Sequence, residues 1–125
     1  MGLGAGQNMV FTVDTLSIST AGQAHIYMPY RGRIISLTAT QHIALATADT
    51  DIGVKIGGTV VAGLLFTIAF TGAAPGITDS ATPDAVAKNA AGGYFEAGDS
   101  VEIESDGVGA TGTASFTLVV SAQDR

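Results

Sequence analysis

Cysteine and tryptophan are both missing from this sequence of 125 residues. Without cysteine, the fold can contain neither a disulfide nor a thiolate-ligated metal. Aromatic residues are also few, at 6%, so the chain is poorly equipped with stacking platforms for sugars. Because a cysteine-free chain suits either redox environment, its cysteine content indicates no compartment.

Charge is scarce as well, at 13% of the residues against roughly 25% in ordinary soluble domains. Eleven acidic residues outnumber five basic ones, and the net charge of −6 would repel duplex nucleic acid. Hydrophobic residues reach 46%, with a mean hydropathy of +0.40. We expect other subunits to cover part of this charge-poor surface, the alternative being a neutral exterior of Thr, Ser, Ala and Gly.

No apolar run is long enough for a membrane span. The longest, residues 60–70, is interrupted by Gly63 and Thr67, whereas a spanning helix needs about twenty apolar residues. A basic segment followed by an apolar one is also missing at the N-terminus, so no secretory signal is expected. We therefore expect no membrane partner.

The length suits one domain preceded by a short arm. Gly2, Gly4 and Gly6 make residues 1–7 a Gly-rich arm that is expected to lack regular structure by itself. We assign residues 8–125 to a single β-sandwich domain.

Alternation of apolar and polar residues dominates from residue 8 onward. It predicts strands at residues 9–13, 16–19, 24–28, 33–39, 52–61, 64–70, 100–105 and 114–121. Within 33–39 the pattern puts Ile35, Leu37 and Ala39 on one face. Gly57-Gly58 predicts a hairpin turn, because a type I′ turn needs positive φ at both central residues. The fold class is therefore all-β, an antiparallel β-sandwich of the jelly-roll kind with about eight strands.

One long segment, residues 71–93, is rich in small residues and contains Pro75, Gly76 and Pro83. It is expected to be a surface excursion, and loops of this length in small domains are often functional. Residues 84–91 within it are compatible with a short helical turn.

Residues 107–112, Gly-Val-Gly-Ala-Thr-Gly, match the dinucleotide-binding fingerprint letter for letter. That site needs a helix directly afterwards, whose N-terminus meets the pyrophosphate. A strand pattern follows here instead, so the segment is interpreted as a hairpin loop.

Acidic residues gather near the C-terminal third of the chain, with a smaller pair upstream: Glu96, Asp99, Glu102, Glu104 and Asp106, then Asp49 and Asp51. These carboxylates could supply calcium ligands or an acid and base for glycoside hydrolysis. We expect a solvated strand face and polar turns instead, because no EF-hand spacing is present.

His25 and His42 are the only histidines, one short of a three-ligand zinc site unless a carboxylate joins them. No Gly-x-Ser-x-Gly motif supports a Ser-His-Asp site. Structural or interfacial roles are expected for both histidines, and we expect no enzyme activity, cofactor or bound metal.

Tyr27, Tyr30 and Arg31 cluster around Pro29. Tyrosine and arginine are favoured anchors of protein interfaces, so these three are candidate interface residues. A plain corner between two strands explains the cluster equally well.

Two segments resemble known families. Residues 94–103, Tyr-Phe-Glu-Ala-Gly-Asp-Ser-Val-Glu-Ile, resemble the turn and late strand of trimeric jelly rolls of the C1q and tumour-necrosis-factor type. The order of elements over residues 24–121 resembles small tailed-phage virion proteins, which decorate or cement capsids or build head fibres. It comprises Met28-Pro29 leading into a strand, the Gly57-Gly58 hairpin, the loop rich in small residues and Ala97-Gly98-Asp99 before a strand.

The resemblance implies a homotrimeric jelly roll on the outer capsid surface of a virion. There it would bridge neighbouring copies of the major capsid protein, with the N-terminal arm pairing onto a neighbour as an added strand. The alternative is a receptor- or carbohydrate-binding module of a phage fibre. The candidate interface residues are Gly2, Leu3, Gly4, Tyr27, Tyr30 and Arg31.

Overall fold

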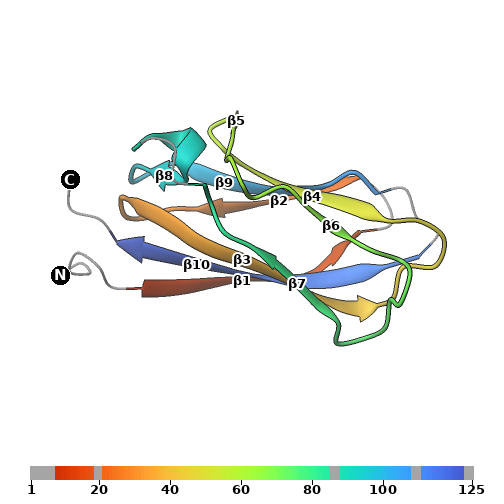
Figure 1. Ribbon diagram of the computed structural model, residues 1–125. Coiled ribbons are helices and arrows are strands. Elements are labelled where there is room, and N and C mark those ends of the chain that lie inside the picture. Colours follow the sequence, from red (N-terminus) through yellow and green to blue (C-terminus); the bar gives the residue numbers. More distant parts are fainter. Residues whose placement is uncertain (1–7, 19–20, 85–87, 108–110, 123–125) are drawn as a thin grey trace.

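The computed structural model describes residues 8–18, 21–84, 88–107 and 111–122, and these form two packed β-sheets (Figure 1). The strands are β1 (Asn8–Ser17), β2 (Gly22–Tyr27), β3 (Gly32–Ile43), β4 (Thr50–Ile56), β5 (Thr59–Val60), β6 (Phe66–Ile68), β7 (Thr78–Ala81), β8 (Tyr94–Phe95), β9 (Ser100–Ser105) and β10 (Thr113–Ala122). The 3-10 turn η1 (Ala90–Gly92) precedes β8. The predicted all-β class is confirmed.

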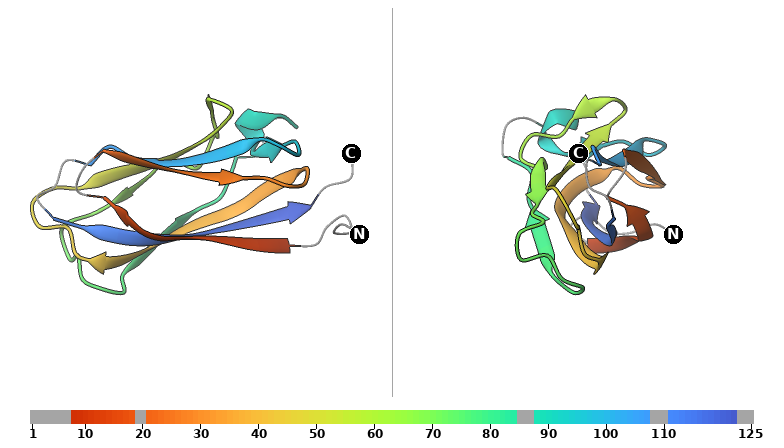
Figure 2. Two further views of the ribbon diagram at one scale, coloured as in Figure 1. Left: turned by 180° about the vertical axis from the view of Figure 1, so that it is seen from behind. Right: turned by 90° about the vertical axis from the view of Figure 1, so that its right-hand side faces the viewer.

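The order of strands in the two sheets is that of a jelly roll. The first sheet runs β1-β10-β3-β7, with β8 extending the β7 side of β3. The second runs β2-β9-β4, and β5 and β6 pair with successive parts of the free edge of β4. Every pairing is antiparallel, and the sheets form separate layers in Figure 2. We call the two layers the β10 sheet and the β9 sheet.

The core lies between the layers because the inward side chains of both sheets are apolar. On β10 the alternation predicted from the sequence is confirmed. Phe116, Leu118 and Val120 are buried, whereas Thr117 and Val119 between them are half-buried. Ile34 and Leu37 from β3 and Ile52 from β4 join them in the core between the two sheets. Burial of such side chains contributes about 1.5–3 kcal/mol each and is the main source of stability.

A bulge in β3 changes which side chains of this strand face the core. The register against β10 shifts between Val119 and Val120, so that Ile34 turns inward and Ile35 lies outside with 37% of its surface exposed. The expected sharing of one face by Ile35, Leu37 and Ala39 is therefore wrong for Ile35. A bulge places two successive residues against one partner, which reverses the alternation at that point.

The hairpin at Gly57-Gly58 is confirmed. These glycines have φ of 56° and 87°, and they join β4 to β5. The predicted strand over residues 64–70 is shorter in the structure, where only Phe66–Ile68 pairs with β4. Residues 9–13 and 16–19 were expected as two strands, but β1 is continuous across a register shift between Val13 and Leu16.

The expected surface excursion over residues 71–93 contains a strand that the composition did not predict and a 3-10 turn that overlaps the end of the stretch compatible with a helical turn. Thr78–Ala81 pairs with Leu37–Thr40 and completes the β10 sheet as β7. Ala90–Gly92 forms η1, capped by the side chain of Asn89, which accepts a hydrogen bond from Ala91 N. Within the described residues, no helix is long and apolar enough to cross a membrane.

Candidate protein interface

One end of the sandwich, where β1 begins and β10 ends, is here called the basal end (Figure 1). Three of the predicted interface residues, Tyr27, Tyr30 and Arg31, lie there. Residues 28–31 connect β2 in one sheet to β3 in the other at this end. Two backbone hydrogen bonds hold the connection: Met28 N donates to Asp99 O, and Gly98 N donates to Met28 O. The Met28 side chain is fully buried in the core and so anchors the connection to the sandwich.

An apolar cleft opens beside this connection, and we call it the basal cleft. Its lining comes from four separate parts of the chain: Met9, Phe11, Met28, Pro29, Tyr30, Arg31, Phe95, Val120 and Ala122. The open volume is about 10 Å³, enough for one water molecule but far below the size of a small-molecule site. A cleft this small is not a ligand site, but it leaves apolar side chains at the basal surface.

The exposure of the predicted residues differs along the connection. Tyr27, directly before the basal cleft in sequence, has 67% of its surface exposed, and Tyr30 in the lining has 37%. Arg31 pairs with Glu96, with Nη2 3.0 Å from Oε1. The tyrosines have the exposure of interface anchors, whereas Arg31 also serves the corner between strands. The other predicted residues, Gly2, Leu3 and Gly4, lie outside the described residues.

Arg33 also lies at the basal end, although no sequence pattern singled it out as an interface residue. Its guanidinium carbon lies 5.2 Å from the centre of the Tyr94 ring, and Nε donates to Gly92 O at 3.2 Å. A cation over an aromatic face stabilises by about 0.5–1 kcal/mol at exposed sites. The contact ties β3 to β8 and stiffens the basal end.

The upstream acidic pair and Asp106 lie at the opposite end, which we call the acidic end, where their carboxylates hold loops together. Asp106 Oδ1 accepts from Asp51 N at 3.0 Å and from Thr50 Oγ1 at 3.1 Å. Asp49 Oδ1 accepts from Phe70 N at 3.0 Å. In the described part of the chain, no three His, Asp or Glu side chains are grouped closely enough to hold a metal ion.

Replacing Asp106 by Ala should therefore destabilise the fold. Two hydrogen bonds to a charged acceptor would be lost, one of them from Thr50, which is 1% exposed. We expect the free energy of unfolding in urea to fall by about 1.5 kcal/mol. Asp14→Ala is the control, because it removes the same charge from an exposed position on β1. Equal losses in the two variants would contradict the assigned role.

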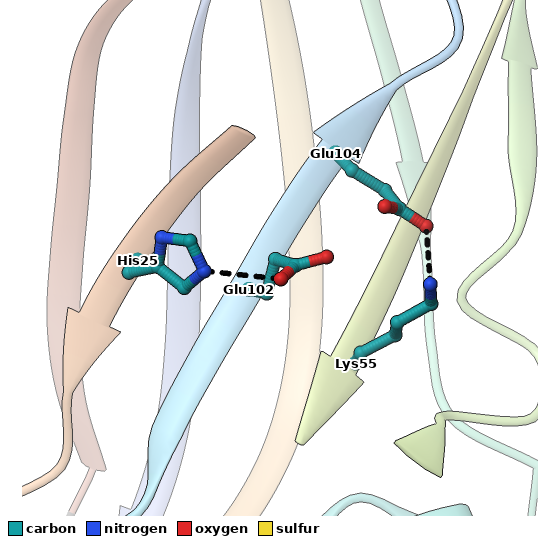
Figure 3. A network of polar contacts seen from close by, with 4 residues as sticks. All are labelled: His25, Lys55, Glu102 and Glu104. Atoms are coloured by element: carbon teal, nitrogen blue, oxygen red, sulfur yellow. Dashed lines mark hydrogen bonds and ion pairs between the residues drawn. The ribbon is translucent and has the colours of Figure 1, made fainter. Parts of the chain in front are cut away.

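Glu102 and Glu104, two of the acidic residues expected on a solvated strand face, lie on the outer face of the β9 sheet (Figure 3). Glu102 Oε1 lies 3.0 Å from His25 Nε2 on β2, and Glu104 Oε1 lies 3.3 Å from Lys55 Nζ on β4. Each carboxylate has a cross-strand partner of its own, and such pairs stabilise neighbouring strands. This arrangement matches the expected solvated strand face.

The hairpin loop expected at residues 107–112 falls in part on residues 108–110, which lie outside the described residues. The flanking strands β9 and β10 belong to different sheets and do not pair with each other, so they are not the two arms of a hairpin. β10 follows where a nucleotide site would need a helix. Gly112 is enclosed, because a Cβ there would lie 2.7 Å from Leu45 Cδ2.

Two broader depressions flank the end of β9. One, of about 360 Å³, is lined by Asp51, Gly53, Leu65, Glu104, Ser105 and Asp106. The other, of about 370 Å³, is lined by Ala21, Gly22, Gln23, Glu104 and Ser105. Both are open to solvent and neither contains an aromatic side chain. They differ from the basal cleft in being wider and in having carboxylates in their lining.

Comparisons with known proteins give little that bears on this surface. No family model matches the chain, and no curated protein matches it. Among solved structures, the chain is similar to a chain in the structure of infectious bursal disease virus, Gx strain, with 14% sequence identity and a TM-score of 0.38. The match covers 98% of this chain and 37% of that one, so the chain spans less than half the length of that protein. A likeness this distant decides neither fold nor function.

Proposed function

We propose that the chain is a non-enzymatic structural protein of a virion, which decorates a tailed-phage capsid by binding across neighbouring subunits of the major capsid protein. The jelly roll suits this role, since it is common in viral capsid domains, although it also occurs in lectins. Because a fold by itself does not specify function, the proposal depends on the basal surface.

The basal cleft is the observation that carries the proposal. Its mainly apolar lining includes Tyr30, and the exposed Tyr27 lies three residues earlier at the end of β2. Aromatic anchors beside apolar pockets are the usual centres of protein interfaces. Its volume is too small for a metabolite, and what it offers to a partner is the mainly apolar surface around it. Docking here would place the basal end on the outer surface of the capsid.

The distribution of charge supports the same orientation. At the basal end the basic residues Arg31 and Arg33 offset the acidic residues Glu96 and Asp99, whereas the opposite end carries Asp49, Asp51 and Asp106. The acidic end would then project into solvent, away from the capsid and its packaged genome. A negative outer surface also helps to keep the particles soluble.

Tyr27→Ala should weaken binding of the purified protein to capsids by at least about tenfold, as expected for loss of an interface anchor. Binding can be measured by co-sedimentation with capsids of the phage that encodes the chain, prepared without the protein. Leu65→Ala is the matched control, because Leu65 is 69% exposed, against 67% for Tyr27, and lies away from the basal cleft. Failure of the unmodified protein to bind capsids, or equal loss in both variants, would overturn the proposal.

The alternative function is a receptor- or carbohydrate-binding module of a phage fibre. The observation in its favour is the depression beside Asp51, Glu104 and Asp106, whose volume of about 360 Å³ falls within the range of ligand sites. Carboxylates can accept hydrogen bonds from sugar hydroxyls, although aromatic stacking is missing. Binding on a glycan array, with and without a chelator, would favour this alternative over decoration.

A further inference from the structure

The two outer faces of the sandwich differ sharply in charge. The outer face of the β9 sheet carries the ionic pairs of His25, Lys55, Glu102 and Glu104. The outer face of the β10 sheet carries Ser, Thr and Val instead. The register sets its side chains in rows across the strands, and in their described members these rows contain no Asp, Glu, Lys, Arg or His.

The rows follow from the pairing partners. One row contains Val10, Val119 and Ser36; the next contains Thr12, Thr117, Thr38 and Ser80; a third contains Ser115, Thr40 and Thr78. Three charged or titratable side chains border these rows. Arg33 lies at the basal edge, the exposed His42 follows Thr40 at the other end of β3, and the exposed Asp14 lies in the β1 bulge opposite Ser115, at the β1 end of the third row.

An apolar strip crosses the basal half of this face. Val10 on β1 is 60% exposed, and its partner Val119 on β10 is half-buried. Ile35, turned outward by the bulge of β3, is 37% exposed beside Ser36. Three neighbouring strands thus each present a branched apolar side chain, surrounded by hydroxyl groups.

We infer that this face binds a second copy of the same chain, so that two β10 sheets pack face to face around a two-fold axis. Charge argues for a second copy as the occupant. Two chains of net charge −6 repel wherever their acidic surfaces meet, and these rows bring no like charges together. A two-fold pairing needs only that the face be complementary to itself, as rows of small, uncharged side chains are.

The area of the face is sufficient for such a pair. The four strands β1, β10, β3 and β7 have 10, 10, 12 and 4 residues. Counted over their full length at ordinary strand spacing, they cover about 600 Å² per copy. The pair would bury about 1,200 Å² in total, the lower limit of stable, specific interfaces. We therefore expect a reversible dimer, with the sheets about 10 Å apart as in other face-to-face packings.

The inference concerns the purified chain alone and does not depend on capsid binding. Sedimentation equilibrium across a wide range of protein concentration should show a species of twice the 12.5 kDa chain mass. Val10→Glu and Ile35→Glu should each weaken this association by about tenfold or more, since each buries an unpaired charge in the pair. Gln23→Glu adds the same charge on the β9 sheet and should leave association unchanged.

Single-cysteine variants give an independent measurement, because the chain has no cysteine of its own. Thr117→Cys, near the middle of the face, should be linked into a dimer by a short bis-maleimide, whereas Gln23→Cys should not. Circular dichroism of each variant confirms that it has folded. A monomer at every concentration, the mass of a trimer as implied by the family resemblance, or a dimer indifferent to both glutamate variants would each overturn the inference.

Discussion

Phe116→Ala should lower the free energy of unfolding by about 4 kcal/mol, the largest effect expected of any single side-chain truncation here. Phe116 is 1% exposed and is the largest of the fully buried side chains. It projects into the core from β10, which pairs with β1 on one side and β3 on the other. The resulting cavity would therefore lie between the two sheets, beneath an interior strand. Domains of this size are stable by about 5–15 kcal/mol, and such a loss is a large fraction of that.

Urea unfolding followed by circular dichroism, at one fixed protein concentration, measures this loss. Phe70→Ala is the matched control, since the same atoms are removed from a side chain that is 40% exposed. We expect that variant to lose about 1 kcal/mol or less. Losses of similar size in the two variants would show that the core is not organised around β10 as the structure has it.

Gly63→Ala should destabilise the fold by about 3 kcal/mol through two separate costs. Its φ of 86° lies in the left-handed region, where an L side chain costs about 1–2 kcal/mol. A Cβ would also lie 2.6 Å from Asp84 N and 2.7 Å from Thr82 O. Both contacts are to backbone, which must move, and overpacking of this kind adds about 1–3 kcal/mol.

Gly58→Ala separates the two costs. Gly58 has almost the same φ, 87°, but a Cβ there would have nothing within 4 Å. We expect it to lose only about 1 kcal/mol, the backbone part of the penalty. The difference between the two variants in thermal or urea unfolding then measures the close approach of residues 82–84. If Gly58→Ala cost as much as Gly63→Ala, the close packing at Gly63 would be refuted.

Local sequence patterns correctly predicted the features that are decided by residues adjacent in sequence. Gly57-Gly58 predicted the β4–β5 turn because the conformation needed there is a property of glycine itself. The alternation of β10 predicted its buried face correctly. On β3 the same rule failed at Ile35, because the bulge that turns it outward arises from pairing with β10.

β7 shows why a strand can escape sequence analysis. Thr78–Ala81 has no large β-forming side chain, and its surroundings contain Pro75 and Gly76. It is a strand because β3 offers an edge of unpaired backbone groups beside it. Hydrogen bonding to that edge outweighs the weak local preference, and the preference alone predicted a loop.

The candidate site divides in the same way. Tyr27, Tyr30 and Arg31 could be selected from residue type and from their position around a proline. The rest of the basal cleft could not be selected, since Met9, Phe95 and Val120 come from three distant strands. Similarly, the neutral face of the β10 sheet was invisible in the sequence, because β1, β10, β3 and β7 are neighbours only in space.

The sequence by itself determined the all-β class, the charge-poor and acidic composition and the tight turn at Gly57-Gly58. These follow from side-chain chemistry and from conformational preferences that act within a few residues. The tertiary structure alone decided which strands share a sheet, how charges separate between the outer faces, and what lines the basal cleft. Those properties depend on hydrogen bonds and packing between segments more than a hundred residues apart, such as the start of β1 and the end of β10, which no local pattern encodes.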